Sequence, residues 1–136
     1  MIINDSRSMK LFLEDVLKQF DDCEITHSYS DGNIALNYIK FQKPDVIILD
    51  LEMPVMDGLT FLETLSVSER IPTIIVSKYA KNDSDMIHDA MNLGALDSLE
   101  PPQNNTAEEF EKFNNLLHHK IVKASLVSKR FSLIKH

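Results

Sequence analysis

Apolar residues recur at spacings of three and four in five stretches of the chain, the pattern of helices with one buried face. The first stretch follows Ser6, a residue type that often caps a helix N-terminus. The second opens at Asp31-Gly32, and we expect Pro44 to end it, because proline cannot continue a helix. The apolar positions of the five stretches fall within residues 9–20, 34–39, 59–65, 86–91 and 110–124.

Between these stretches lie short runs rich in β-branched residues, which predict strands. The clearest run, Asp45–Asp50, is apolar on both faces, as in an interior strand of a parallel sheet covered by helices on each side. Thr73–Ser77 follows Pro72 and has the same character. Weaker candidates for strands are Met1–Asn4, Cys23–Tyr29 and Ala95–Leu99.

The last two helices have their own boundary signals. Asp83 or Ser84 caps the fourth helix, and Gly94 stands where a left-handed C-cap belongs. Thr106-Ala-Glu-Glu109 is a capping box for the fifth. A single helix over 106–134 would be about 44 Å long, and a domain of this size spans about 30 Å. We therefore divide the chain into a domain of residues 1–120 and a helical extension or linker of residues 121–136.

Strands that alternate with helices predict a doubly wound, three-layer α/β/α fold around a five-stranded parallel sheet, with an extended C-terminal helix. In such sheets ligands bind beyond the carboxyl ends of the strands, where the strand order switches. Asp5, Asp50 and Ser77 each end a predicted strand. We expect these three polar side chains to meet at one edge of the sheet and form a site.

The length and the net charge of the chain limit the number of domains and the kinds of partner that it can have. The 136 residues, 43% hydrophobic and 26% charged, suit one globular domain. The net charge of −7 disfavours binding to nucleic acid or to an anionic membrane. No apolar run is long enough for a bilayer, and Asn4–Arg7 precede any apolar stretch of a signal peptide. We expect a soluble, cytoplasmic domain.

The small numbers of glycine and cysteine residues exclude several nucleotide-binding, hydrolase and zinc-binding motifs. With three glycines, the chain has neither a Gly-x-Gly-x-x-Gly loop nor a Walker A loop, and it lacks a Gly-x-Ser-x-Gly elbow. Its single cysteine, Cys23, cannot form an internal disulfide, and no Cys/His group has zinc spacing. His118 and His119 are adjacent, so they point to different sides of a helix and cannot chelate one metal. We expect Cys23 to be a small buried apolar residue and the five histidines to have no functional role.

The order and spacing of several short motifs identify a family. The strongest stretch, residues 44–58, contains Glu52-Met53-Pro54 and Met56-Asp57-Gly58. Over about residues 2–126 the chain resembles the receiver domains of bacterial two-component response regulators, above all those of chemotaxis protein-glutamate methylesterases. Further matching motifs are Asp31-Gly32 before Ala35-Leu36, Leu93–Asp97 ahead of a proline, and Lys120–Ala124, which resembles the start of an interdomain linker.

The resemblance implies a flavodoxin-like receiver fold and a phosphorelay function. Asp50 would accept a phosphoryl group from a sensor histidine kinase, and Ser77 would hydrogen-bond a phosphoryl oxygen. Mg²⁺ would be held by the side chains of Asp5 and Asp50 and by the backbone carbonyl of Glu52. The partners implied are the kinase and an output protein or domain at the fourth and fifth helices or the tail helix, with a homodimer as a further option. The chain carries no esterase domain, so the activity implied is phosphorylation and dephosphorylation at Asp50 and no demethylation.

Three positions depart from the family pattern. Asn4 stands where the family has the first of two adjacent acids, although an asparagine can still hold a metal-bound water. Pro101 replaces the lysine that contacts the phosphoryl group and supplies neither charge nor donor. Ser98 replaces the aromatic switch residue of the last strand. Lys78, beside Ser77, or Arg7, two residues past Asp5, would be a substitute cation.

These departures leave alternatives open. The chain could be a degenerate pseudo-receiver that binds partners without phosphorylation, through a fixed surface or the tail helix. A phosphatase-like hydrolase is a weaker alternative, because it would need an aspartate as general acid where this chain has Glu52.

Overall fold

The computed structural model describes residues 1–53, 56–68, 70–78 and 85–134. Its centre is a five-stranded sheet in which every pairing is parallel and the spatial order is β2-β1-β3-β4-β5. β1 lies between β2 and β3, so the strand order switches at β1. The strands are β1 (Ile2–Ile3), β2 (Ser28–Tyr29), β3 (Ile47–Leu49), β4 (Thr73–Val76) and β5 (Asp97–Leu99).

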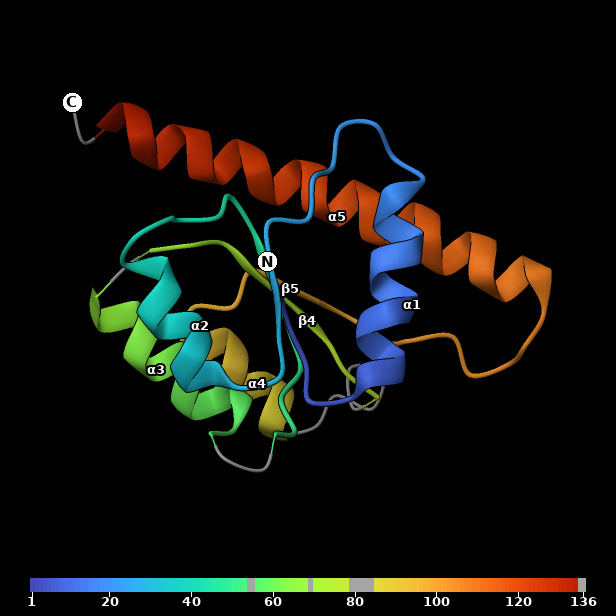
Figure 1. The fold of residues 1–136 in the computed structure, drawn as a ribbon, viewed down its shortest axis with the longest axis horizontal. Coiled ribbons are helices and arrows are strands. Elements are labelled where there is room, and N and C mark those ends of the chain that lie inside the picture. The colour runs from blue at the N-terminus through green and yellow to red at the C-terminus, as the bar shows by residue number, and fades with distance from the viewer. Residues whose placement is uncertain (54–55, 69, 79–84, 135–136) are drawn as a thin grey trace.

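Helices cover both faces of the sheet, which makes the three layers that the sequence predicts. In Figure 1, α2, α3 and α4 lie on one side of the sheet, and α1 and the long α5 lie on the other. The doubly wound parallel fold with an extended last helix is thus confirmed. The helices are α1 (Arg7–Lys18), α2 (Gly32–Ile39), α3 (Gly58–Ser68), α4 (Asp85–Asn92) and α5 (Ala107–Ile134).

Side chains satisfy the free backbone groups at the predicted helix ends. The Ser6 hydroxyl accepts a hydrogen bond from the Met9 N–H at 3.2 Å, and the Thr106 hydroxyl accepts one from the Glu109 N–H at 3.2 Å. Gly94 has a φ of +108°, the left-handed conformation expected after α4. These caps are confirmed, while the expected cap of α4 at residue 83 or 84 lies outside the described residues.

Two predicted boundaries are wrong. Only Ser28–Tyr29 of the expected strand Cys23–Tyr29 is paired, because Cys23 and Ile25 instead pack into the apolar cluster between the sheet, α1 and α5. The second helix ends at Ile39, ahead of Pro44, where the Tyr38 carbonyl accepts hydrogen bonds from the N–H groups of residues 41 and 42 and closes a final turn.

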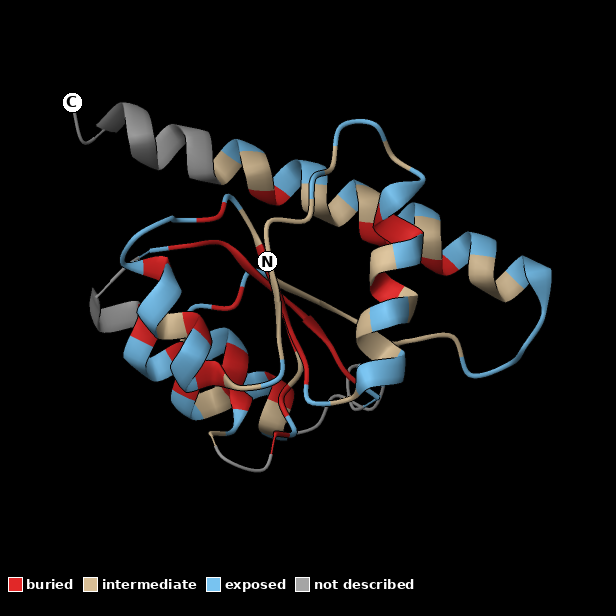
Figure 2. Cartoon of the chain, in the orientation of Figure 1, coloured by how far each residue is buried: buried red, intermediate tan, exposed pale blue. Residues whose placement is uncertain are grey.

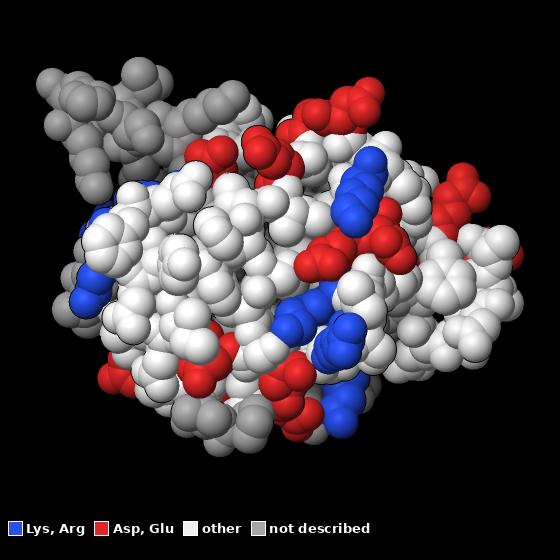
Figure 3. Space-filling view, viewed as in Figure 1, with Lys and Arg blue, Asp and Glu red and all other residues white. Residues whose placement is uncertain are grey.

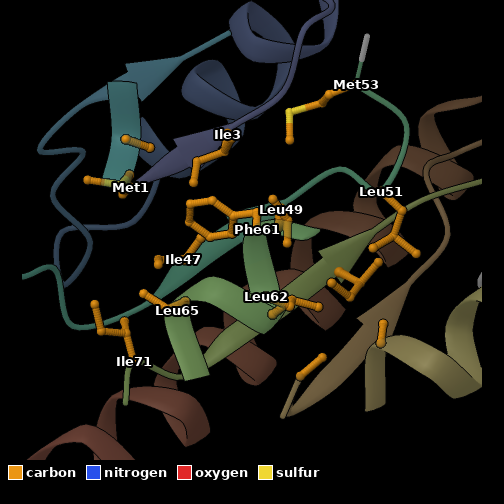
Figure 4. Packing of buried hydrophobic residues seen from close by; sticks show 14 of the residues in the cluster. Met1, Ile3, Ile47, Leu49, Leu51, Met53, Phe61, Leu62, Leu65 and Ile71 are labelled. Carbon is orange, nitrogen blue, oxygen red and sulfur yellow. The ribbon is translucent and has the colours of Figure 1, made fainter. Parts of the chain in front are cut away.

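Each face of the sheet has its own apolar cluster, because β3 is buried on both sides. Under α2, α3 and α4, the ring of Phe61 is fully buried against Ile3 and Leu49, as Figure 4 shows. On the other face, α1 and α5 press Leu13 and Leu117 onto the sheet. In Figure 2 the buried positions of α5 face the sheet. The resulting frame holds the strand ends in fixed positions.

α5 runs without interruption through the proposed boundary at residue 120. Ala124, beyond that boundary, is fully buried, and Ile121 packs on the cluster under α1 and α5. The division into 1–120 and 121–136 stays a prediction. None of the helices in the described part of the chain has the length and apolar character needed to cross a membrane.

Candidate phosphoacceptor site

Asp50 follows β3 at the carboxyl edge of the sheet. Its backbone N–H donates to the Ile3 carbonyl at 2.9 Å, which fixes the start of the loop after β3 beside β1. Its carboxylate is half-buried, and Oδ1 accepts a hydrogen bond from the Glu52 N–H at 3.3 Å. The carboxylate is therefore held by its own loop while one side remains open to solvent.

The surroundings of Asp50 disfavour its negative charge. Burial is the main cause that raises the pKa of this carboxyl group from 3.8 to about 6; the hydrogen bond from the Glu52 N–H opposes the rise, and the nearby carboxylates of Asp5 and Glu52 add to it. The charge would be stabilised by any cation that reaches these carboxylates. A raised carboxyl pKa beside other carboxylates at the carboxyl edge of a parallel sheet is typical of a functional site.

Asp5 and Asn4 follow β1, the neighbouring strand at the switch point. Asp5 is exposed at the edge of the sheet, whereas Asn4 is buried. The Asn4 side-chain oxygen accepts a hydrogen bond from the Ser6 N–H at 2.8 Å. Asn4 thus helps to start α1, and its proposed hold on a metal-bound water stays a prediction.

Ser77 directly follows β4, the strand on the other side of Asp50. The register pairs Ile3 with Leu49 and Leu49 with Ile75, so Asn4, Asp50 and Val76 come next at the same edge, and Asp5 and Ser77 each lie one residue further on. Ser77 is 4% exposed, and its N–H donates to the Leu99 carbonyl at 3.1 Å. Adjacent strands are separated by about 4.8 Å, so Ser77 follows the strand next to that of Asp50, and contact of its hydroxyl with a group attached to Asp50 stays a prediction.

A lysine side chain supplies positive charge near the carboxyl edge of the sheet. The Lys78 ammonium lies 3.6 Å from the Glu52 carboxylate, whose own backbone N–H holds Asp50. Arg7, the other candidate, is the exposed first residue of α1. Pro101 lies in the loop after β5 and lines a pocket of about 280 Å³ between that loop and α5. Lys78 is the candidate that a described contact ties to the loop of Asp50.

The available ligands suit a hard cation. The carboxylates of Asp5 and Asp50 and the carbonyl of Glu52 are all oxygen donors, the type that Mg²⁺ prefers. Burial chiefly, and the neighbouring carboxylates to a smaller extent, raise the pKa of Asp50, and a divalent cation would offset both effects. The residues present fit the metal that the sequence resemblance implies.

Fold and site together define a doubly wound α/β protein with a carboxylate site at the switch point of its sheet. A model of the response regulator receiver domain matches residues 1–108, and the chain belongs to this family. Receiver domains generally depend on Mg²⁺.

Individual relatives support the same assignment. A protein-glutamate methylesterase/protein-glutamine glutaminase of Hydrogenovibrio crunogenus is 33% identical over 129 residues, which are 95% of this chain and 34% of that protein. The response regulator domain of Thermotoga maritima CheB is 27% identical with a TM-score of 0.81, over 91% of this chain and 92% of that one. A Mn²⁺-bound form of response regulator Rcp1 shares the fold, with a TM-score of 0.71 and 21% identity over 85% of this chain and 88% of that one. The chain spans about a third of the length of the curated relatives that it matches.

The structure also brings together three residues that the sequence analysis left without a role. Asp22, Cys23 and His118 offer donor atoms that all lie within 4.8 Å of one another. Asp22 and His118 are 96 positions apart in the chain, so no spacing motif could reveal the group. The ring of His118 contacts the Asp22 carboxylate, and the expectation that the histidines have no functional role stays a prediction. The one available signal was the presence of Cys23 beside an aspartate in a strongly acidic loop.

Proposed function

We propose that the chain is a phosphorylatable receiver that takes a phosphoryl group onto Asp50 from the phosphohistidine of a sensor histidine kinase. The observation that carries this proposal is the half-buried Asp50 carboxylate at the switch point, flanked by Asp5 and Ser77 from the neighbouring strands. The resemblance to methylesterase receivers supports a chemotaxis-type pathway. A relay of this kind operates in the cytoplasm.

The transfer itself needs few groups. A carboxylate oxygen of Asp50 attacks phosphorus, a P–O bond forms, and the P–N bond to the histidine breaks with its electron pair returning to the ring nitrogen. The product is an acyl phosphate. The Ser77 hydroxyl donates a hydrogen bond to a phosphoryl oxygen, and the Glu52 N–H keeps the attacking carboxylate oriented. Positioning and charge stabilisation account for most of the catalysis in such transfers.

Charge neutralisation is divided between a metal and a side chain. The side chains of Asp5 and Asp50 and the Glu52 carbonyl would hold Mg²⁺, which would supply positive charge to offset the carboxylates and the incoming phosphoryl group. Lys78 takes over part of the role of the family's phosphate-contacting lysine, whose position Pro101 occupies in this chain. Its ammonium already lies beside the loop that carries Asp50, paired with Glu52.

The phosphorylated state is read by an output partner. We assign the output surface to α4 and α5 or to the tail of α5, and the partner to a methylesterase-type domain or a separate output protein. A homodimer through the tail of α5 is a further form of the same proposal.

A pseudo-receiver is the second candidate, and particular residues favour it. Pro101 has neither charge nor N–H, Ser98 is not aromatic, and the oxygen of Asn4 is engaged by the Ser6 N–H. Such a domain would bind its partner in one fixed state, independent of Asp50.

Beryllofluoride in the presence of Mg²⁺ separates the two candidates, because it forms an acyl-phosphate analogue on an aspartate without a kinase. We expect two-dimensional NMR to show amide shifts at Asp50, Ser77 and α4. The shifts should vanish in Asp50→Asn and persist in Asp45→Asn, a matched change at the exposed opposite end of the same strand. A spectrum that stays unchanged at saturating Mg²⁺ and beryllofluoride would establish the pseudo-receiver.

A further inference from the structure

A second group of metal-ligand types lies away from Asp50, where the loop between α1 and β2 meets α5. Asp22 and Cys23 project from this loop, and His118 comes from α5. Their donor atoms all lie within 4.8 Å of one another. We propose that Asp22, Cys23 and His118 bind one Zn²⁺ ion, with the fourth position open to water.

The distances fit a tetrahedral ion. With the usual zinc bond lengths, oxygen and nitrogen ligands are about 3.4 Å apart, and sulfur and oxygen about 3.5 Å. Cys23 Sγ lies 3.6 Å from Asp22 Oδ1, already at that spacing. His118 Nε2 lies 2.8 Å from Asp22 Oδ1 and 3.0 Å from Oδ2. Entry of the ion would widen this last contact by about half an ångström, within reach of a side-chain rotation.

The three donors are held in place by contacts outside the group. The His118 ring stacks on Phe20 with 4.1 Å between ring centroids and 5° between planes, which turns Nε2 towards Asp22. The Cys23 N–H donates to the Phe20 carbonyl at 3.2 Å, so the loop and the stacking residue move together. Little conformational freedom remains to be lost on binding a metal.

The acidic residues of the loop and the pocket beside it also suit a bound cation that has one coordination position open to water. Asp21, Asp22 and Glu24 are exposed on the loop, and Figure 3 shows acidic side chains gathered over this part of the surface. Asp22 and Cys23 line a pocket of about 300 Å³. Thr26 lines the same pocket, and its buried hydroxyl has no hydrogen-bond partner within the described residues.

Binding exchanges a proton for the metal. Burial and the adjacent Asp22 carboxylate raise the pKa of the Cys23 thiol to about 11, so the thiol is protonated at neutral pH in the free protein. Zn²⁺ displaces this proton, forming the S–Zn bond as the S–H bond breaks and H⁺ passes to solvent. The bound ion would cross-link the α1–β2 loop to α5, an element that carries the tail of the chain.

The test is a Zn²⁺ titration of the intact chain after treatment with chelator and reductant, with Co²⁺ as a spectroscopic probe. We expect one Zn²⁺ per chain and a thiolate-to-cobalt charge-transfer band. Cys23→Ser should abolish the band, and His118→Gln should weaken Zn²⁺ binding by about tenfold or more. His119→Gln, an exposed change next to His118, should leave both unchanged.

Two further readouts keep the outcome decisive. Circular dichroism of each variant checks that it is folded, and Asp50→Asn should retain full Zn²⁺ binding because the proposed magnesium site is separate. The proposal is overturned if no stoichiometric binding occurs, if the cobalt complex lacks the thiolate band, or if His119→Gln weakens binding as much as His118→Gln.

Discussion

The site around Asp50 and the group around His118 are assembled by different means. Asp50 and Ser77 directly follow β3 and β4, and Asp5 lies two residues beyond the end of β1, so backbone pairing alone carries all three to the same edge of the sheet. Asp22, Cys23 and His118 come from a loop and a helix and meet only through side-chain packing. The first offers oxygen donors alone, and the second offers nitrogen, sulfur and oxygen. One small fold thus presents separate surroundings for hard and for softer cations.

The two groups also differ in how charge affects folding. Burial raises the pKa of Asp50 to about 6, so its ionisation opposes the folded state. The hydrogen bond from His118 lowers the pKa of Asp22, so ionisation of Asp22 favours the folded state. The ionised Asp50 side chain is therefore destabilising, whereas the ionised Asp22 side chain, hydrogen-bonded to His118, is stabilising.

Of the changes that test this comparison, Gly58→Ala should have the largest effect on stability, because it disturbs the close packing of the backbone at residues 50 and 51. An added Cβ would lie 2.6 Å from the Asp50 carbonyl oxygen and 2.6 Å from Leu51 Cα, both backbone atoms that cannot move aside cheaply. We expect a loss of about 2–3 kcal/mol in the free energy of unfolding, measured with urea. Gly32→Ala is the control, because its Cβ would meet only the side chains of Met56 and Phe61, at 3.1 Å. Equal losses in both variants would contradict the close approach at residue 58.

The next largest effect is the pH dependence that Asp50 gives to the free energy of unfolding. Because its pKa is higher in the folded protein, the folded state holds the proton more tightly between pH 3.8 and about 6, and stability falls as pH rises through this window. The partly exposed carboxylate should cost about 1–2 kcal/mol above pH 6. Urea unfolding between pH 4 and pH 8 should show this contribution in the parent chain and its absence in Asp50→Asn. Mg²⁺ at pH 7 should restore part of the loss in the parent alone. The same slope in both proteins would exclude Asp50 as its source.

A smaller effect is expected from Lys78→Ala. Its ammonium is exposed and screened, so removing it should slow phosphorylation by a small-molecule phosphodonor about two- to fivefold at low salt. The difference should shrink as salt rises. Lys18→Ala, an exposed change of the same charge at the last turn of α1, should leave the rate unchanged. An unchanged rate in Lys78→Ala would rule out this lysine as the substitute cation.

The smallest effect should come from Asp22→Asn, measured with chelator present. The lowered pKa of Asp22 means that its contribution to stability is present above pH 3.8 and is lost as pH falls through the lower, folded-state value. Thermal unfolding should show a slightly lower midpoint for the variant at pH 7 and no difference in strong acid. A difference of the opposite sign at pH 7 would contradict the stabilising contact with His118.

The sequence predicts the site around Asp50 better than the rest of the molecule for a physical reason. Strand ends are local signals, and parallel pairing carries Asp50 and Ser77 to one edge whatever the details of packing. Asp57, part of the Met56-Asp57-Gly58 motif, lies just before α3, and its side-chain oxygen accepts a hydrogen bond from the Thr60 N–H at 2.8 Å. The segment from Cys23 to His27 has a strand-like pattern too, but its apolar side chains serve the cluster under α5 instead of a sheet ladder. Contacts between elements distant in sequence, such as that of His118 with Asp22, have no local signal at all.

The unbroken course of α5 has a geometric consequence for anything attached to it. A helix advances by about 1.5 Å and turns by about 100° with each residue. From Ala124, which is locked against the domain, to Ile134 the helix therefore sets both the distance and the rotational phase of what it carries. Deleting one residue there would swing an attached partner by more than a quarter turn, whereas deleting seven would nearly restore its facing. The length of the C-terminal part of α5 therefore determines both how far a group joined to it lies from the domain and which way that group faces.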